Sequence, residues 1–139
     1  GSYYLTGNVN GAAGMRGIEI AANGVTIDFM GYTLAGAPGS LDGVGRSVGG
    51  SNIRISNGFI RGWDGWGVDL SEGINGAATA LTVSQNGAGG VFLGQNSVIE
   101  RCIARASKSC WTWSSTIRAK ATNTGRCSVS RAWKTTSIT

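Results

Sequence analysis

The chain of 139 residues contains no histidine, one proline and no apolar run near the length of a membrane span. The absence of histidine excludes the usual general base and every Ser-His or Cys-His nucleophile pair. A transmembrane helix needs about 20 consecutive apolar residues, so we expect no membrane span. Apolar residues nevertheless make up 41% of the chain, which is too many for a disordered protein.

Cysteine is scarce and confined to the last third of the chain, at Cys102, Cys110 and Cys127. Their spacings match no zinc motif, so we expect no metal site and no bound cofactor. One disulfide with a remaining thiol and three reduced thiols both fit this odd count. The sequence shows no signal peptide and begins at Gly1 rather than at a methionine.

Charge is divided unevenly along the chain. Residues 1–100 carry four basic and seven acidic side chains, a net charge of −3. Residues 101–139 carry eight basic side chains and no acid, a net charge of +8. The positive overall charge of +5 therefore arises entirely from the C-terminal segment, and the charges of the two parts need separate explanations.

Twenty-four glycines punctuate short apolar alternations, a pattern in which internal repeats are sought first. A phrase of glycine, aliphatic, variable and aliphatic residues recurs at intervals of 26, 24 and 23 residues. Its copies are Gly17-Ile18-Glu19-Ile20, Gly43-Val44-Gly45-Arg46, Gly67-Val68-Asp69-Leu70 and Gly90-Val91-Phe92-Leu93. The second copy keeps only its first half.

Further alternating segments lie between these copies, among them Val25-Thr26-Ile27 and Ile53-Arg54-Ile55. Period-two alternation is typical of strands with one buried face, and the breaks fall at pairs such as Asn23-Gly24 and Asn57-Gly58 that suit sharp corners. Short strands at this period predict coils that close and stack on their copies. An antiparallel sandwich or barrel is the alternative, but it does not explain why one phrase returns once per two or three strands.

Four segments resemble bacterial right-handed parallel β-helix repeat proteins of the pectate-lyase-like superfamily. They are Tyr3-Tyr4-Leu5-Thr6-Gly7-Asn8, Gly17-Ile18-Glu19-Ile20, Val25-Thr26-Ile27-Asp28-Phe29-Met30-Gly31-Tyr32-Thr33-Leu34 and Asn57-Gly58-Phe59-Ile60-Arg61-Gly62-Trp63. The resemblance implies an all-β fold, a right-handed parallel β-helix of about four coils, and a secreted or cell-surface location. That superfamily contains lyases, hydrolases and binding modules, so the resemblance implies no single activity.

The repeat runs from Gly17 to Ala104 and then fails. The next glycine phrase is due near residue 114, where the chain reads Ser114-Ser115-Thr116. We divide the chain into a parallel β-helix over 1–106 and an irregular basic tail over 107–139. The tail fits a cap on the last coil, a disordered basic arm, or a segment outside the reading frame of the repeat.

Asp64, Asp69 and Glu72, with Arg61 close by in sequence, are weak candidates for a catalytic site. In β-helix polysaccharide lyases, as the resemblance implies, clustered acids hold Ca²⁺ and a basic side chain abstracts a proton. Ca²⁺ is a cofactor of this chain only in that case. The alternative is that these residues are simply the outward polar side chains of solvated strands. The lack of an Asp-rich calcium loop favours this alternative.

Trp63 and Trp66 flank Asp64 in a glycine-rich loop. Exposed aromatic rings in such a loop stack on sugar faces, and Asp64 would orient hydroxyl groups. These three residues are the candidates for carbohydrate binding. The alternative is that one ring folds back over the edge of a coil and covers the core.

The leading functional hypothesis is a non-catalytic β-helix scaffold that binds polysaccharide and associates with itself. About four coils leave two open ends whose unpaired strand groups invite pairing, so we expect homo-oligomers through coil ends or side faces. The alternatives are a fragment of a carbohydrate-active enzyme and a truncated domain with no independent function. The tail interleaves tryptophan with basic residues, but no recognised nucleic-acid module accompanies it, and nucleic-acid binding is not expected.

Overall fold

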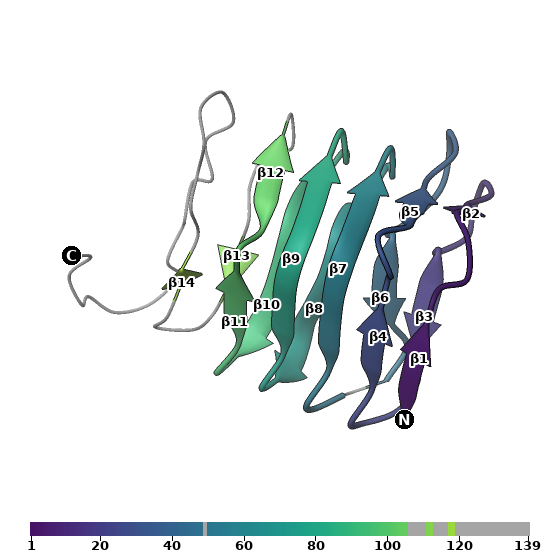
Figure 1. The fold of residues 1–139 in the computed structure, drawn as a ribbon. Coiled ribbons are helices and arrows are strands. Elements are labelled where there is room, and N and C mark those ends of the chain that lie inside the picture. Colours follow the sequence, from purple (N-terminus) through teal and green to yellow (C-terminus); the bar gives the residue numbers. More distant parts are fainter. Residues whose placement is uncertain (49, 106–110, 113–116, 119–139) are drawn as a thin grey trace.

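The computed structural model describes residues 1–48, 50–105, 111–112 and 117–118, and these residues form an all-β, parallel β-solenoid of about four turns (Figure 1). No helix occurs in this described part of the chain, which therefore holds none that is long and apolar enough to cross a membrane. Every strand pair found there is parallel. The solenoid prediction is confirmed, and the antiparallel alternative is wrong.

The strands stack into two sheets (Figure 1). The main path of the nine-stranded sheet runs in the order β1 (Ser2–Tyr4), β4 (Thr26–Asp28), β7 (Arg54–Arg61), β9 (Ala77–Ser84), β11 (Val98–Glu100) and β14 (Ile117–Arg118). Alongside it, β2 (Val9–Asn10) pairs with β5 (Thr33–Ala35), β5 pairs with β7, and β12 (Ile103–Arg105) pairs with β9. The five-stranded sheet consists of β3 (Ile18–Ile20), β6 (Val44–Arg46), β8 (Trp66–Ile74), β10 (Gly89–Gln95) and β13 (Trp111–Thr112).

Equivalent residues of the recurring glycine phrase pair with one another in the five-stranded sheet, so the phrase sets the register of that sheet. Its first aliphatic residues stack directly on one another, in the order Ile18, Val44, Val68 and Val91. A Cβ on Gly43 would lie 2.5 Å from the carbonyl oxygen of Gly67, and one on Gly67 would lie 2.6 Å from that of Gly90. Real Cβ atoms do not approach a carbonyl so closely, so the phrase begins with glycine because the next coil passes through that space.

Asparagine forms the corner that leads into β7, β9 and β11. Asn52, Asn75 and Asn96 all have a left-handed backbone, with φ of 58°, 57° and 52°, and they occupy equivalent positions in successive coils. The side-chain Nδ2 of Asn75 donates to Oδ1 of Asn52 at 3.3 Å. Asparagine tolerates this backbone conformation better than other residues with a side chain. The left-handed corner therefore explains why asparagine recurs at this position of the repeat.

The core runs as columns of inward aliphatic side chains between the sheets. One column of the nine-stranded sheet contains Ile27, Ile55, Ala78 and Ile99, all 4% exposed or less. Ser2, Thr26 and Arg54 alternate with these positions on the outer side of the same strands. Each coil contributes only a few buried side chains, so the stack as a whole supplies the apolar interior.

Strand pairing extends past residue 106 at two places. Trp111 pairs with Phe92 in the five-stranded sheet, and Ile117 pairs with Ile99 in the nine-stranded sheet. Strands β1 to β12 lie within the predicted body over 1–106, whereas β13 and β14 lie in the predicted tail. The other residues of the predicted tail, and with them Cys110, Cys127 and the choice among cap, arm and out-of-frame segment, lie outside the described residues.

Candidate functional site

Trp63 is a core residue. Its side chain is 1% exposed, its Nε1 donates to the carbonyl oxygen of Leu34 at 3.2 Å, and its main-chain N–H donates to Oδ1 of Asn86 at 3.1 Å. A Cβ on Gly17 would lie 2.7 Å from the ring, so glycine makes room for it. A buried ring offers no face to a sugar. The expected Trp63–Trp66 platform is therefore absent among the described residues, and the packing alternative applies to Trp63.

Arg61 and Asp64 lie apart from the other catalytic candidates. Arg61 is exposed at the end of β7, and Asp64 is exposed in the connection between β7 and β8. Oδ2 of Asp64 accepts a hydrogen bond from the main-chain N–H of Gly39 at 2.8 Å. Neither residue lines the groove that contains Asp69 and Glu72.

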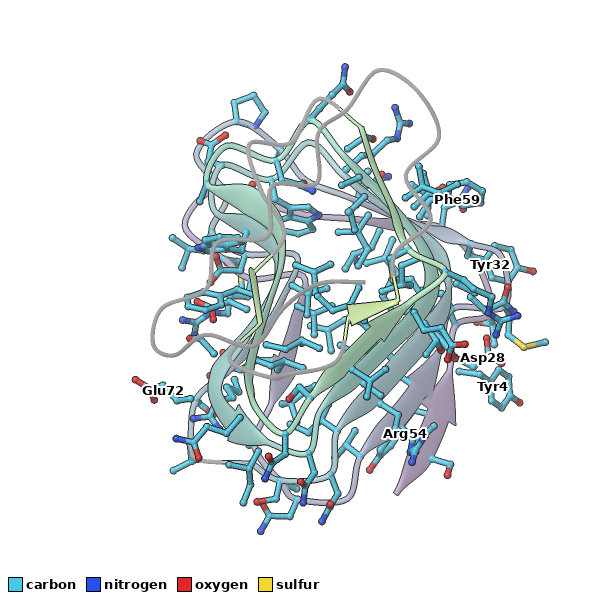
Figure 2. All side chains as sticks on the ribbon, turned by 90° about the vertical axis from the view of Figure 1, so that its left-hand side faces the viewer. Tyr4, Asp28, Tyr32, Arg54, Phe59 and Glu72 are labelled. Carbon is cyan, nitrogen blue, oxygen red and sulfur yellow. The ribbon has the colours of Figure 1, made fainter. Side chains whose placement is uncertain are left out.

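That groove, of about 140 Å³, lies over β6 and β8 and is bordered almost entirely by polar groups. We call it the polar groove and define it by Arg16, Asp42, Gly45, Arg46, Asp69, Ser71 and Glu72. In the view along the solenoid, Glu72 lies on the side opposite Tyr4, Asp28, Tyr32 and Phe59 (Figure 2). The structure thus brings Asp69 and Glu72 to one place, together with two arginines that were not among the candidates.

Stacking of the coils explains why these residues meet. The residue before each repeat glycine occupies one column, which contains Arg16, Asp42, Trp66 and Gly89. The variable third residue of each phrase occupies the next outward column, which contains Glu19, Gly45, Asp69 and Phe92. Paired strands lie roughly 4.8 Å apart, so residues about 24 positions apart in sequence become direct neighbours.

Arg16 is held across the bare backbone of Gly45. Its Nε lies 3.3 Å from Oδ2 of Asp42, and its Nη1 lies 4.0 Å from Oε1 of Glu19. A Cβ on Gly45 would lie 2.7 Å from both Cδ and Nε of Arg16, so a larger residue there would displace this side chain from its present position. Oδ1 of Asp42 accepts the main-chain N–H of Trp66 at 2.8 Å, which fixes the carboxylate between the two neighbouring coils.

Arg46 occupies the fourth position of its phrase, which is aliphatic in the other copies, and it pairs with Ile20. Its side chain is only 6% exposed. Nη2 lies 3.2 Å from Oε2 of Glu72, whose side chain is 87% exposed, and Nη1 lies 3.5 Å from the carbonyl oxygen of Gly50. The Arg46 guanidinium therefore joins an exposed carboxylate to a main-chain carbonyl at the polar groove.

An aromatic pair adjoins the polar groove. The rings of Trp66 and Phe92 have centroids 5.1 Å apart and are tilted by 41°. The half-buried ring of Trp66 occupies the space where a side chain at Gly89 would lie. Phe92 pairs with Asp69 in the sheet, so the pair lies next to one of the carboxylates of the groove.

Sequence reasoning missed Arg16, Asp42 and Arg46. The signal was present in the second copy of the phrase, Gly43-Val44-Gly45-Arg46, where glycine and arginine replace the variable and aliphatic residues. Those two substitutions open the space that Arg16 crosses and place a guanidinium at the groove. Aligning the four copies as columns would have brought these residues together.

Ionic contacts dominate the polar groove, with three carboxylates and two guanidinium groups around it. Within the described part of the chain, no three His, Cys, Asp or Glu side chains are grouped closely enough to hold a metal ion. In comparisons with known proteins, no family model, no curated protein and no solved structure matches this chain.

Proposed function

We propose that this chain is a non-catalytic scaffold of the bacterial right-handed β-helix type, pectate-lyase-like in architecture, which binds polysaccharide through the polar groove. The observation that carries the proposal is the convergence of Arg16, Asp42, Arg46, Asp69 and Glu72 at one outward groove beside Trp66. The same proposal includes a secreted or cell-surface location, because the polysaccharides that such a scaffold would bind lie outside the cell.

The chemistry of the groove suits a ligand rich in hydroxyl groups. Carboxylates such as Asp69 and Glu72 accept hydrogen bonds from hydroxyls, and a guanidinium donates to their oxygens, both with the added strength of a charged partner. The ring of Trp66 supplies an apolar surface for the C–H face of a sugar, in the usual combination of an aromatic wall with a few placed polar groups.

The distribution of the acids favours binding over catalysis. A lyase-type site requires Asp64, Asp69 and Glu72 to share one centre, and Asp64 instead lies at the connection before β8, bonded to Gly39. Arg61, the proposed proton acceptor of that alternative, is likewise outside the polar groove. The remaining carboxylates of the groove are each engaged with an arginine or a main-chain N–H.

The test is a screen of the protein against an array of plant and bacterial polysaccharides, followed by titration calorimetry on those that bind. Asp69→Asn should weaken binding by roughly 10- to 150-fold, because a hydrogen bond to a charged group contributes roughly 1.5–3 kcal/mol. Asp28→Asn is the matched control. Both carboxylates accept the main-chain N–H of the residue two positions ahead, but Asp28 lies on the opposite side of the solenoid (Figure 2).

Equal weakening by both variants, or no binding by the unmodified protein, would contradict the proposal. Ca²⁺-dependent release of unsaturated products from an acidic polysaccharide would replace it with the enzyme alternative.

A further inference from the structure

The charges around the polar groove do not cancel. Its lining includes the three carboxylates of Asp42, Asp69 and Glu72 and the two guanidinium groups of Arg16 and Arg46. Nε of Arg16 lies 3.3 Å from Oδ2 of Asp42, and Nη2 of Arg46 lies 3.2 Å from Oε2 of Glu72. Each guanidinium is therefore matched by a carboxylate of its own, and the remaining negative charge of the groove belongs to Asp69.

The stacking of the coils leaves Asp69 without a positive neighbour. The residues before and after it in its column are Gly45, which has no side chain, and Phe92, which carries no charge. Oδ1 of Asp69 accepts the main-chain N–H of Ser71 at 3.1 Å. Within the described part of the chain, this half-buried carboxylate forms no salt bridge and its Oδ2 accepts no hydrogen bond. Asp69 therefore presents an unneutralised acceptor at the groove.

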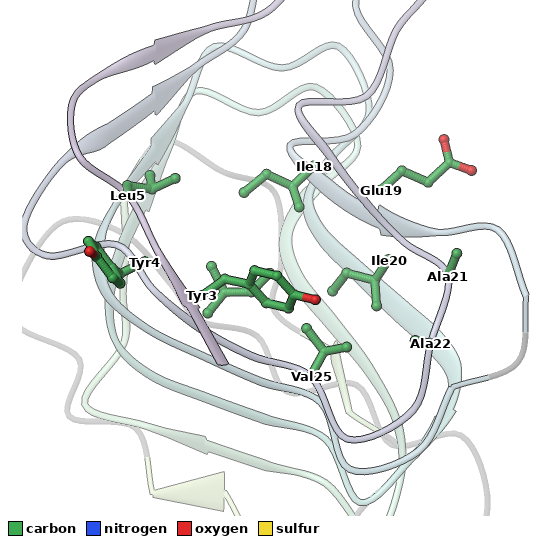
Figure 3. A pocket seen from close by; sticks show the side chains of 10 residues that line it. Tyr3, Tyr4, Leu5, Ile18, Glu19, Ile20, Ala21, Ala22 and Val25 are labelled. Atoms are coloured by element: carbon green, nitrogen blue, oxygen red, sulfur yellow. The ribbon is translucent and has the colours of Figure 1, made fainter. Parts of the chain in front are cut away.

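Glu19 adds to this excess of negative charge. It is the one charged residue among the described residues that line a second, mainly apolar hollow of about 470 Å³ at the first coil. Figure 3 shows that its carboxylate is directed away from Tyr3, Ile20 and Val25, which line the same hollow. Oε1 of Glu19 lies 4.0 Å from Nη1 of Arg16. Arg16 is thus shared by two carboxylates, and the surroundings of the polar groove are more acidic than its lining alone.

We propose that the polar groove selects polysaccharides of amino sugars, whose protonated amine forms a salt bridge with Asp69. The proposal rests on the proposed function, because it names the class of sugar that the same groove binds. A primary ammonium group is compact and has three N–H donors. Partial burial of Asp69 makes the ion pair less sensitive to screening by salt than a fully exposed pair.

The same distribution of charge disfavours polysaccharides of uronic acids. A sugar carboxylate in this place would face the carboxylate of Asp69, and like charges repel. The two arginines do not offset this repulsion without weakening their existing contacts with Asp42 and Glu72. A neutral hydroxyl donates a hydrogen bond to Asp69 but forms no ion pair. We therefore expect affinity to fall in the order amine, hydroxyl, carboxylate.

Trp66 distinguishes an amino sugar from a simple cation. Its half-buried ring adjoins the polar groove and lies three positions before Asp69 on β8. An aromatic ring supplies an apolar surface for the C–H face of a sugar while the polar substituents bind charged groups. A peptide of lysines carries the same ammonium groups but has no sugar face, so it should bind more weakly than an amino-sugar oligomer of equal charge.

Titration calorimetry with three oligosaccharides tests the order. Oligomers of glucosamine, glucose and glucuronic acid with the same linkage and length differ in the charge of one substituent on each sugar. At a mildly acidic pH the amine is protonated and the carboxylates stay ionised. The glucosamine oligomer should bind about fivefold more tightly than the glucose oligomer, at the upper end of the range for exposed ion pairs. The glucuronic acid oligomer should bind most weakly, and added salt should narrow these differences.

Two variants of Asp69 test whether this residue causes the preference. Asp69→Asn keeps an oxygen for the N–H of Ser71 and removes the charge, so the affinities for the glucosamine and glucose oligomers should become equal. Asp69→Lys should invert the order and favour the glucuronic acid oligomer. Asp28→Asn is the matched control and should keep the preference, because Asp28 lies on the opposite side of the solenoid from Glu72 (Figure 2).

Equal affinity for the three oligosaccharides, or tightest binding of the glucuronic acid oligomer, would overturn the proposal and leave polysaccharide binding by the groove standing. A preference that persists in Asp69→Asn or disappears in Asp28→Asn would also overturn it, as would a lysine oligomer that binds as tightly as the glucosamine oligomer. Binding of none of the three oligosaccharides would overturn it too, and the wider polysaccharide array then decides the proposed function separately.

Discussion

At the scale of single residues, glycine in this protein is mostly a requirement of close stacking. Gly43 has ordinary backbone geometry, yet a Cβ there would lie 2.5 Å from the carbonyl oxygen of Gly67 and 2.8 Å from Cγ2 of Ile60. One of these neighbours is backbone and cannot move without shifting the next coil. The position therefore selects glycine by the space available and not by backbone torsion.

Gly43→Ala should destabilise the protein by about 1–3 kcal/mol, the usual cost of forcing extra volume into a packed region. Gly7→Ala is the control, because nothing lies within 4 Å of a Cβ at Gly7. That change should be neutral or slightly stabilising through the unfolded state. Urea unfolding followed by tryptophan fluorescence measures both effects, and equal midpoints for the two variants would refute the stacking explanation.

At the scale of elements, the sequence was informative wherever one phrase controls one strand. The copies at Gly17, Gly67 and Gly90 correctly predict β3, β8 and β10 and their register, because glycine and alternating aliphatic residues act locally. The candidate site was predicted only in part: Asp69, Glu72 and Trp66 were named, and the arginines beside them were not. Those contacts join residues of different coils, such as Arg46 and Glu72, which no local pattern brings together.

The connection from β7 to β8 shows where local patterns mislead. Trp63 and Trp66 look alike in a glycine-rich loop, yet Trp63 is buried in the core and Trp66 lies outward beside Phe92. The difference arises from Gly11 and Gly17 of the first coil, which leave the space that the Trp63 ring fills. Which ring folds inward depends on residues more than 40 positions away, so the loop sequence alone does not decide it.

Trp63→Ala should cost about 3–5 kcal/mol of stability, as large aromatic truncations in a core do. Trp66→Ala should cost clearly less, because its ring is half-buried on the outer side. Only Trp66→Ala should weaken polysaccharide binding while the fold is retained. Thermal unfolding and calorimetric titration measured on both variants separate the two roles, and a larger stability loss at Trp66 would contradict the assignment.

At the scale of the whole molecule, strand pairing joins each coil only to the coils directly before and after it. Stability of such a stack is a sum of coil terms and nearest-neighbour interfaces. The third coil, with β7 and β8, is paired on both sides, whereas the first coil, with β1 to β3, is paired on one side within the described residues. The same loss of core packing should therefore have different consequences in the two coils.

Ile20→Ala and Ile55→Ala compare these coils with identical chemistry, since the two side chains are 4% and 0% exposed. Ile55→Ala should lower global stability by about 2–5 kcal/mol, because the third coil links both halves of the stack. Ile20→Ala should instead speed amide hydrogen exchange in β1 to β3 and leave β8 to β10 protected, because an end coil opens locally before the whole unfolds. Exchange mass spectrometry at a concentration that keeps the protein monomeric distinguishes these outcomes. Uniform loss of protection in both variants would mean that the solenoid unfolds as one unit and that its first end is no weaker than its middle.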